Sequence, residues 1–423
     1  MDELLVTGGC RLKGRVRASG AKNAALPIMA AAILADGPVR LRNVPNLADI
    51  RTMSRLLREL GVSVEREERS GDLIIANQDH AKIVAPYKIM RTMRAGICVL
   101  GPLVARRGKA EVSLPGGCAI GDRPVDLHLK GLRSLGAKLD IRHGYIVGGA
   151  KRLRGTEMYL GGPAGSTVTG TANVLMAAVL AKGETVIDCA ACEPEVQDLA
   201  RMLVKMGARI QGIGSPRLVV EGVDGLSGAE HSVIPDRIEA GTFLVAAAAT
   251  RGDVYVEGAR WNDLFAVVHV LREAGAQVEH FDDTIRVRAP NGLRSVDITT
   301  LPFPGFPTDL QAQMAAMLTV ADGISIITDK IFPDRFMYVA ELNRMGAAIR
   351  KEGNAVVVHG PRRLSGAPVM ASDLRASAAL VIAGLVADGK TRISRIYHLD
   401  RGYEHIEKKL ARLGAKVRRV KES

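Results

Sequence analysis

Two interleaved series of glycine-terminated segments constrain the fold of this chain more than any other feature. In the first series, six apolar segments each end at a glycine before a strand-like run, at Gly37, Gly108, Gly183, Gly252, Gly323 and Gly389. In the second series, six amphipathic segments end in the same way, at Gly61, Gly136, Gly207, Gly275, Gly346 and Gly414. Successive glycines of either series lie about seventy residues apart, which indicates a sixfold repeat.

Each repeat is predicted to contain a buried helix, a strand, an outer helix and two further strands. Glycine at the C-cap ends both kinds of helix, and alternating residues after the second glycine begin a strand. The helices of the first series are apolar on nearly every face, so several repeats must enclose them together. Three repeats could place three such helices inside a shell of sheets and outer helices, and six repeats then make two lobes. A propeller holds no such helix and a solenoid leaves one face wet, which disfavours both.

Length and composition agree with two aliphatic cores. The chain has 423 residues, more than one ordinary domain, and is 47% hydrophobic but only 4% aromatic. The longest apolar run, residues 24–35, is shorter than the ~20 residues that a membrane span needs. The N-terminus lacks the apolar segment of a signal peptide, and five cysteines make no disulfide framework in a chain this long. We therefore expect a cytoplasmic protein without membrane insertion.

The formal net charge of +13 leaves a nucleic-acid-binding protein open as an alternative. Against it stand a single tryptophan, no aromatic-basic cluster for base stacking and no helix-turn-helix motif. Part of the excess is a C-terminal segment that contains Lys408, Lys409, Arg412, Lys416, Arg418, Arg419 and Lys421. A solvated face explains such a segment more often than a partner does, and the same field would gather polyanionic small substrates. We expect no nucleic-acid partner.

Polar and charged residues stand just before the buried helices, at equivalent positions of the repeat. Helix N-termini offer free N–H groups and the positive end of the dipole, which suit phosphates and carboxylates. For Ser19 and Ser372 we expect ordinary capping. Lys22, Arg94 and Arg375 are different, because the dipole disfavours a cation there and an anionic ligand would explain it. If both lobes point these helix ends at one cleft, the cleft is an anion-binding site.

One loop, residues 114–126, combines a cysteine with a nearby cation. It contains three glycines and two prolines, and Arg123 follows Cys118 by five residues. A thiol near a guanidinium ionises more easily. The alternative is a surface loop with an accidental cysteine, and the loop alone does not decide between the two.

The other four cysteines are predicted to be structural. Cys189 and Cys192 form a CxxC sequence, but a redox or zinc site would need a thioredoxin-like context or a second ligand pair. Cys10 and Cys98 are interpreted as small core residues.

Seven separated motifs along nearly the whole chain resemble the UDP-N-acetylglucosamine 1-carboxyvinyltransferase family. They are SGAKNAALP at 19–27, LPGGCAIGDRPVDLH at 114–128, VIPDRIEAGTFLVAAAAT at 233–250, PFPGFPTDLQAQ at 302–313, IFPDRFM at 331–337, SDLRASAAL at 372–380 and LDRGYEHIEKKL at 399–410. The resemblance implies two inside-out α/β barrels of three repeats each, with the active site in the cleft between them. It places the N-terminal barrel at residues 22–232 and the C-terminal barrel at residues 1–21 plus 233–423.

The family's activity follows from the same resemblance. Its members transfer the enolpyruvyl group of phosphoenolpyruvate to the 3′-hydroxyl of UDP-N-acetylglucosamine and release phosphate, the first committed step of peptidoglycan precursor synthesis. The resemblance thus implies two small-molecule substrates, no cofactor, no metal and no obligate protein partner. It also implies a role in cell-wall biogenesis, cell shape and cell division, and a target for fosfomycin. The nearest alternative is the sister enzyme acting on shikimate 3-phosphate, but the sister family lacks the PGGC sequence found at 115–118.

Site roles are carried over residue by residue. Cys118 matches the proton-donating lid cysteine, Asp309 matches the base for the 3′-hydroxyl, and Asp373 matches a residue of the same proton traffic. The implied catalytic set is Cys118, Asp309, Lys22, Arg401 and Asp373. Phosphoenolpyruvate would contact Lys22, Asn23, Arg123, Arg335, Arg375 and Arg401, with Arg335 and Arg375 on its carboxylate. UDP-N-acetylglucosamine would contact Asn23, Arg94, Arg123, Pro124, Val125, Asp126, Leu127, Thr167, Val168, Thr169, Asp309 and Ile331.

The chemistry requires these residue types independently of the resemblance. Forked arginines pair best with the several negative charges of phosphoenolpyruvate. Protonation of its methylene carbon needs a placed acid, and the attacking hydroxyl needs a base. One segment departs from the family pattern: Gly165 stands where many members carry a lysine, and Ala172 stands where a glutamate is frequent. Residues 167–169 could still bind through backbone N–H groups.

Overall fold

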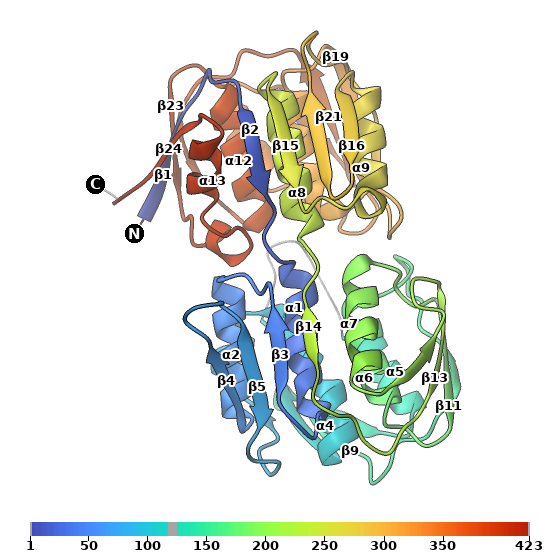
Figure 1. The fold of residues 1–423 in the computed structure, drawn as a ribbon. Helices are drawn as coiled ribbons and strands as arrows, with labels where there is room; N and C mark the ends of the chain where they lie inside the picture. Colours follow the sequence, from blue (N-terminus) through green and yellow to red (C-terminus); the bar gives the residue numbers. More distant parts are fainter. Residues whose placement is uncertain (1, 117–124, 422–423) are drawn as a thin grey trace. The chain divides into compact units, whose positions relative to one another are not determined.

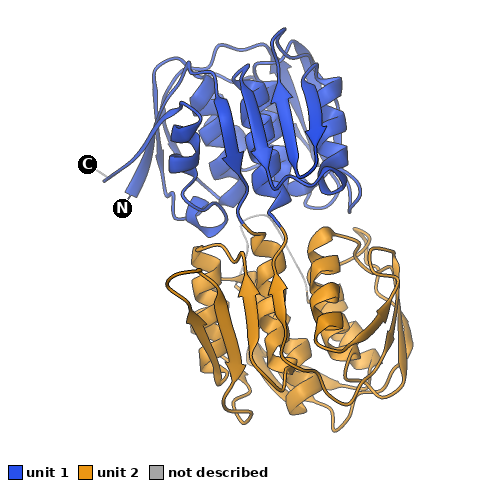
Figure 2. Cartoon of the chain, viewed as in Figure 1, with its two compact units in different colours: residues 1–19, 119–121, 235–423 blue, residues 20–118, 122–234 orange. Residues whose placement is uncertain are grey.

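The computed structural model describes residues 2–116 and 125–421, which form two compact units (Figure 2). Unit 1 contains residues 2–19 and 235–421, and unit 2 contains residues 20–116 and 125–234. The chain enters unit 2 between Ser19 and Gly20 and returns to unit 1 between Ile234 and Pro235. The boundaries expected from the resemblance, 21/22 and 232/233, lie two residues from these crossings.

Three four-stranded sheets in each unit share one strand order (Figure 1). In every sheet a first edge strand runs parallel to its neighbour, and the other two pairs are antiparallel. The sheets of unit 2 are β14 (Glu230–Ser232), β3 (Val39–Arg42), β5 (Leu73–Asn77) and β4 (Val62–Arg66); β6 (Val84–Ala85), β7 (Lys109–Ser113), β9 (Tyr145–Gly149) and β8 (Lys138–Arg142); and β10 (Glu157–Tyr159), β11 (Glu184–Asp188), β13 (Arg217–Glu221) and β12 (Arg209–Gln211).

Unit 1 repeats the arrangement, and its first two strands come from the N-terminus. Its sheets are β2 (Lys13–Arg17), β15 (Asp253–Glu257), β17 (Thr284–Arg288) and β16 (Gln277–Phe281); β18 (Ile298–Thr300), β19 (Gly323–Asp329), β21 (Ala355–Gly360) and β20 (Ile349–Glu352); and β22 (Pro368–Met370), β23 (Lys390–Ser394), β1 (Asp2–Thr7) and β24 (Lys416–Lys421). Leu4 of β1 is paired with Ile393 on one side and Arg419 on the other, and Val16 of β2 is paired with Val256.

Helices of the first predicted series form the core of each unit. They are α1 (Lys22–Ala31), α4 (Leu100–Arg107) and α6 (Val168–Ala178) in unit 2, and α8 (Arg237–Ala249), α10 (Gln311–Leu318) and α12 (Leu374–Val386) in unit 1. All eight residues of α10 are buried, as the all-round apolar sequence predicts. The prediction that three such helices lie inside each shell is confirmed.

Amphipathic helices of the second series cover the outside. They are α2 (Ala48–Glu59), α5 (Asp126–Ser134), α7 (Pro194–Lys205), α9 (Trp261–Glu273), α11 (Tyr338–Arg344) and α13 (Ile406–Arg412). The shorter helices are α3 (Tyr87–Met90), η1 (Ala32–Leu34), η2 (Arg94–Val99), η3 (Thr308–Leu310) and η4 (Leu399–Arg401). In the described part of the chain, no helix has the length and apolarity that crossing a membrane would require.

The glycine prediction is right for one series and partly wrong for the other. All six glycines after the outer helices have φ between 73° and 110°, the left-handed conformation that ends a helix. In the first series, Gly37 and Gly252 do not adopt it, and Arg251 does so in place of Gly252. Glycine is needed at 252 for another reason, because a Cβ there would lie 2.2 Å from the carbonyl oxygen of Leu12.

Short edge strands are the part of the repeat that the sequence did not predict. β6, β10, β14, β18 and β22 contain only two or three residues each, too few to show an alternating pattern. Each of these strands leads toward a buried helix, directly or across a crossing. They therefore determine where the polar helix N-termini emerge from each sheet.

Candidate functional site

A carboxylate between two arginines forms the centre of the site in unit 1. Asp309 lies in η3, after the loop 302–307. Its Oδ1 lies 2.7 Å from Nη1 of Arg335, and its Oδ2 lies 2.7 Å from Nη2 of Arg375. The arginine side chains are 8% and 4% exposed, and that of Asp309 is 24% exposed. Three residues that the resemblance assigned to the site, from three separate motifs, are thus in direct contact.

The charges in this cluster are strongly coupled. Burial opposes ionisation of Asp309, but the guanidinium groups of Arg375 and Arg335 outweigh burial and hold the pKa of the carboxyl well below its usual range. Burial also opposes the charge on Arg375, yet Asp309 raises the pKa of that guanidinium above its ordinary value. Both oxygens of Asp309 therefore face guanidinium groups.

Arg375 lies in the first turn of α12 and is held from two directions. Asp373 caps the helix, its Oδ1 accepting from the backbone N–H groups of Arg375 at 2.8 Å and Ala376 at 3.1 Å. Nη1 of Arg375 donates to the hydroxyl of Tyr403 at 3.3 Å, and that hydroxyl also contacts Thr242 Oγ1 at 2.9 Å. Burial raises the pKa of Tyr403, so it stays neutral. The sequence did not single out Tyr403 or Thr242, although both lie inside motifs of the resemblance.

The capping roles predicted for two serines are wrong. The N-cap of α1 is Ala21, whereas the hydroxyl of Ser19 donates to Glu404 Oε2 at 2.9 Å and accepts from Lys409 Nζ at 2.8 Å. At α12 the cap is Asp373, the neighbour of Ser372. Ser19 is thus engaged by Glu404 and Lys409, and at α12 the carboxylate of Asp373 takes the cap position, 3.5 Å from the Ser372 hydroxyl.

Two further site candidates lie in unit 1. Arg401 ends η4, and the neighbouring Asp400 forms two hydrogen bonds, of 2.6 and 2.9 Å, with Arg419 of β24. This pairing ties the η4 turn to the sheet. Ile331 is half-buried after β19, and its backbone N–H donates to Asp329 Oδ1 at 2.9 Å.

In unit 2, Lys22 begins α1 and has an acidic partner. Its Nζ lies 3.1 Å from Oδ2 of Asp49 in the first turn of α2, and both side chains are buried. The sequence prediction attributed a cation at this helix start to an anionic ligand alone. Asp49, which the sequence analysis did not single out, is a second explanation and fixes where the ammonium group lies. Asn23, the next residue, is exposed.

We expect Asp49→Asn to lower the melting temperature, because it removes the carboxylate partner of a buried ammonium group. Loss of one partner of a buried pair costs about 3–5 kcal/mol, whereas an exposed pair contributes about 0–1 kcal/mol. The matched control is Glu230→Gln, since Glu230 pairs with Arg42 in the same unit and their side chains are 62% and 57% exposed. Thermal unfolding of the three proteins checks this. Equal shifts in the two variants would contradict the structural importance of the buried pair.

The remaining unit 2 candidates surround the start of α6 and neighbouring helices. Thr167 caps α6, its Oγ1 accepting from the N–H of Gly170 at 3.2 Å. Val168 is exposed and Thr169 is half-buried. Arg94 begins η2, whereas Val125, Asp126 and Leu127 lie at the start of α5. Cys118, Arg123 and Pro124 lie outside the described residues.

A buried hydrogen-bond chain, which the sequence did not predict, supports Thr169. The Nδ2 group of Asn173 donates to His128 Nδ1 at 2.8 Å, so the proton of this imidazole is on Nε2. His128 Nε2 in turn lies 3.2 Å from Thr169 Oγ1 and donates to it. The side-chain oxygen of Asn173 accepts from the N–H of Gly101 at 2.8 Å, which fixes the amide orientation. The N-terminal turn of α6 is therefore anchored to α5 and α4.

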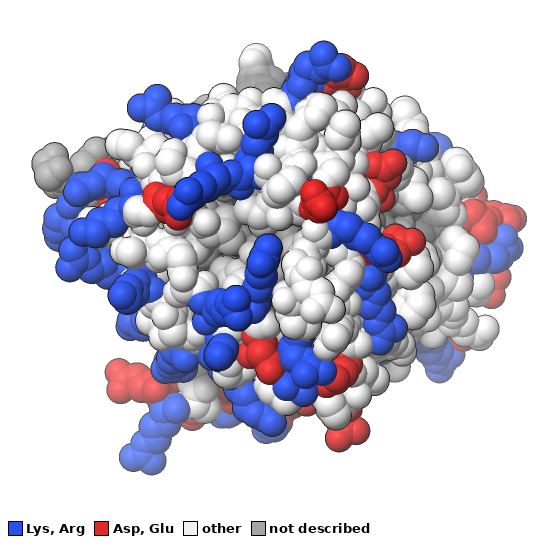
Figure 3. All heavy atoms as spheres, turned by 90° about the horizontal axis from the view of Figure 1, so that it is seen from above, with Lys and Arg blue, Asp and Glu red and all other residues white. Residues whose placement is uncertain are grey.

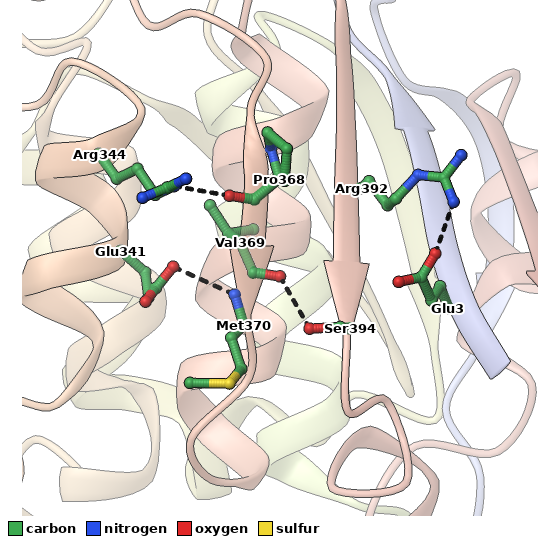
Figure 4. A pocket seen from close by; sticks show the side chains of 8 residues that line it. All are labelled: Glu3, Glu341, Arg344, Pro368, Val369, Met370, Arg392 and Ser394. Carbon is green, nitrogen blue, oxygen red and sulfur yellow. Dashed lines mark hydrogen bonds and ion pairs between the residues drawn. The ribbon is translucent and has the colours of Figure 1, made fainter. Parts of the chain in front are cut away.

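A pocket of about 290 Å³ in unit 1 lies apart from these residues (Figure 4). None of the predicted site residues lines it. Its charged side chains are engaged locally: Arg392 pairs with Glu3 at 2.8 Å, and Glu341 accepts from the N–H of Met370 at 3.1 Å. Within residues 2–116 and 125–421, no group of three or more His, Cys, Asp or Glu side chains is arranged to hold a metal ion.

Comparison with known proteins agrees with this geometry. The family model of EPSP synthase (3-phosphoshikimate 1-carboxyvinyltransferase) matches residues 6–410. The UDP-N-acetylglucosamine 1-carboxyvinyltransferase of Myxococcus xanthus (strain DK1622) is 53% identical over 422 residues, which cover 100% of both chains. The crystal structure of the enolpyruvyl transferase NikO from Streptomyces tendae has a TM-score of 0.90 at 25% identity, covering 100% of this chain and 99% of its own. An EPSP synthase from Acinetobacter baumannii shares the fold with a TM-score of 0.75 at 19% identity over 100% of both chains.

These findings confirm the resemblance that the seven motifs indicated, together with the predicted fold of three repeats in each of two inside-out α/β barrels. The carboxyvinyl-transferase description is common to the family model and the Myxococcus relative, and the NikO structure carries the equivalent enolpyruvyl description. The chain therefore belongs to the EPSP synthase family and is an enolpyruvyl (carboxyvinyl) transferase.

Proposed function

We propose that this enzyme transfers the enolpyruvyl group of phosphoenolpyruvate to the 3′-hydroxyl of UDP-N-acetylglucosamine and releases phosphate. The observation that carries the proposal is Asp309 held between Arg335 and Arg375, three residues from the motifs that resemble this family. The 53% identity to a UDP-N-acetylglucosamine 1-carboxyvinyltransferase supports this acceptor over shikimate 3-phosphate. The product would serve peptidoglycan precursor synthesis in the cytoplasm, and fosfomycin would inhibit the enzyme.

Arg335 and Arg375 are suited to bind the substrate carboxylate, because they already pair with a carboxylate in this structure. Both are buried, so a charge-assisted hydrogen bond to either is screened little by water. When a substrate carboxylate shares these donors, Asp309 loses part of the stabilisation of its anion. Its pKa then rises, and Asp309 becomes a stronger base for the sugar hydroxyl.

The reaction is an addition followed by an elimination. Cys118 donates a proton to the methylene carbon of phosphoenolpyruvate, and the 3′-oxygen bonds to the adjacent carbon as Asp309 takes the hydroxyl proton. Loss of phosphate, with return of a proton from the new methyl group to the Cys118 thiolate, restores the double bond. We assign Lys22, Arg123 and Arg401 to the phosphate, whose charge grows as it leaves.

The sugar nucleotide would bind mainly to unit 2. The N-terminus of α6, with Thr167 as its cap, is suited to a diphosphate because its free N–H groups and dipole attract anions. Backbone donors at 167–169 would replace the lysine that many relatives carry at position 165. Further contacts are assigned to Asn23, Arg94, Arg123–Leu127, Asp309 and Ile331, and Asp373 to proton traffic.

Release of inorganic phosphate tests this function. We expect phosphate release with phosphoenolpyruvate plus UDP-N-acetylglucosamine, and none above background when shikimate 3-phosphate replaces the sugar nucleotide. Mass spectrometry of the nucleotide product should show the added carboxyvinyl group. Turnover of shikimate 3-phosphate in its place would overturn the proposed acceptor while leaving the reaction class intact.

The net positive charge does not require a nucleic-acid partner. Lys and Arg side chains gather at the left edge of the face in Figure 3, and elsewhere on this face they are interspersed with Asp and Glu. Three side chains of the edge strand β24 contribute to the excess, since Lys416, Arg418 and Lys421 are all exposed. Lysine and arginine on an edge strand also hinder pairing with other chains.

A further inference from the structure

Asp329, at the end of β19, is a fully buried carboxylate that accepts five hydrogen bonds. Its Oδ1 accepts from Thr300 Oγ1 at 2.7 Å and from the backbone N–H groups of Ile331 at 2.9 Å and Phe332 at 2.8 Å. Its Oδ2 accepts from Thr308 Oγ1 at 2.7 Å and Gln311 Nε2 at 3.3 Å. The residue is 0% exposed and lies outside the seven motifs of the resemblance. It joins three segments: the end of β18, the start of η3 and α10, and the loop after β19.

Two of these segments carry the central site residues. Thr308 precedes Asp309, and the loop after β19 leads to Arg335. The hydroxyl of Thr308 uses its single hydrogen to donate to Asp329, so only its lone pairs remain, and they accept from Arg335 Nη1 at 3.2 Å. The same Nη1 donates to Asp309 at 2.7 Å. Asp329 therefore determines which way the Thr308 hydroxyl points, and with it one of the acceptors that fix the guanidinium.

We propose that Asp329 is a positioning residue that acts through Thr308 to hold Arg335 where it binds the carboxylate of phosphoenolpyruvate. The inference rests on the proposed role of Arg335. Asp329 would then affect the binding of phosphoenolpyruvate, although it is buried and does not touch the reacting atoms.

Asparagine has the shape of Asp329 but cannot replace it. Gln311 is fixed with its nitrogen toward Asp329, because its oxygen accepts from the hydroxyl of Tyr338 at 2.6 Å and its nitrogen also donates to the carbonyl of Arg335 at 3.0 Å. Burial, followed by the charge of Asp329, raises the pKa of Tyr338 well above its ordinary value, so this hydroxyl keeps its proton. The NH₂ group of an asparagine would face either Gln311 Nε2 or the N–H groups of Ile331 and Phe332, a donor against a donor in both orientations.

Two threonines on the same carboxylate provide a matched test. Thr300 and Thr308 each donate to Asp329 at 2.7 Å, but only Thr308 contacts Arg335. We expect Thr308→Val to raise the KM for phosphoenolpyruvate about tenfold, the usual value of one charge-assisted hydrogen bond. Thr300→Val should leave that KM within about twofold of the wild type while lowering the melting temperature. Asp329→Asn should raise the KM for phosphoenolpyruvate by at least as much as Thr308→Val.

The comparison separates positioning from general stability. A purely structural loss reduces the amount of active enzyme, and so the apparent kcat, without changing KM. If Asp329 acts through Thr308, the double variant Asp329→Asn/Thr308→Val should have a KM no higher than about that of the worse single variant. Equal KM values for Thr300→Val and Thr308→Val, or additive effects in the double variant, would overturn the proposal.

Arg335→Lys shows which assumption fails if the result is negative. If Arg335→Lys leaves the KM for phosphoenolpyruvate unchanged, the proposed role of Arg335 itself is rejected. If Arg335→Lys raises that KM while Thr308→Val and Asp329→Asn do not, the role of Arg335 stands and the positioning role of Asp329 is rejected.

Discussion

Asp309→Asn should remain folded and lose about two to four orders of magnitude in turnover, the usual contribution of a general base. Asparagine keeps the shape of the side chain and one acceptor oxygen, but it cannot take a proton from the 3′-hydroxyl. The substitution also leaves Arg335 and Arg375 without the carboxylate that joins them. We therefore expect some loss of thermal stability in addition to the loss of turnover, because two buried cations are less well paired.

Single-turnover kinetics with phosphoenolpyruvate and UDP-N-acetylglucosamine measure this effect. The matched control is Asp253→Asn in the same unit, since Asp253 also forms two hydrogen bonds of 2.8 Å with one arginine, Arg286. The pKa of Asp253 is likewise lowered, chiefly by its hydrogen bond to Arg286. The control should lose stability and keep its turnover. Near-normal turnover of Asp309→Asn would reduce Asp309 to a structural partner of the arginines.

Treatment with fosfomycin should place a single covalent adduct on Cys118, faster in the presence of UDP-N-acetylglucosamine. Of the five cysteines, Cys118 is the one followed by an arginine within a glycine-rich loop, which favours its thiolate. The structure describes the other four cysteines, which could also react with the drug. Burial raises the pKa of Cys98 to about 12 and also raises the pKa values of Cys10 and Cys192. These three thiols are therefore mostly protonated at neutral pH and react slowly with an epoxide.

Variants at this position separate proton donation from covalent capture. Cys118→Ala should resist the drug and lose most of its turnover, because no acid remains at that position. Cys118→Asp should resist the drug and keep activity, since a carboxylic acid can also donate a proton. Peptide mass mapping of the treated wild type locates the adduct, with Cys189 and Cys192 as internal controls. A label on another cysteine would remove residues 114–126 from the proposed mechanism.

Much of the fold could be predicted from the sequence because it depends on a pattern repeated six times. A buried helix such as α10 has no polar face, and this property is visible without any structure. The glycines after the outer helices were equally informative, because only a left-handed residue continues the chain there. Edge strands of two or three residues, such as β6, have too little sequence to carry a pattern.

The candidate site could be predicted as residue types more readily than as contacts. Charged residues at helix starts indicated Lys22 and Arg375, because the helix dipole makes a cation costly there. The partners of the site residues could not be predicted in this way. Asp49 and Asp329 lie 27 and 21 residues from Lys22 and Thr308, on other elements, and meet them only when these elements pack together, so no helix or strand spacing could reveal the contacts. The misplaced cap at Ser19 has the same origin, since its partners Glu404 and Lys409 lie 385 and 390 residues away. At α12, the adjacent Asp373 takes the cap position in place of Ser372.

The split of unit 1 between the two ends of the chain also affects how the chain can fold during synthesis. The described residues of unit 2 all lie between the two crossings, so this unit can close before residues 235–421 leave the ribosome. Unit 1 cannot, because β1 pairs with both β23 and β24, and Glu3 pairs with Arg392, 389 residues away. Until then, β1 and β2 are nascent segments with unpaired backbone groups, available to chaperones or to neighbouring chains. The segment that is translated first is thus among the last to find its partners.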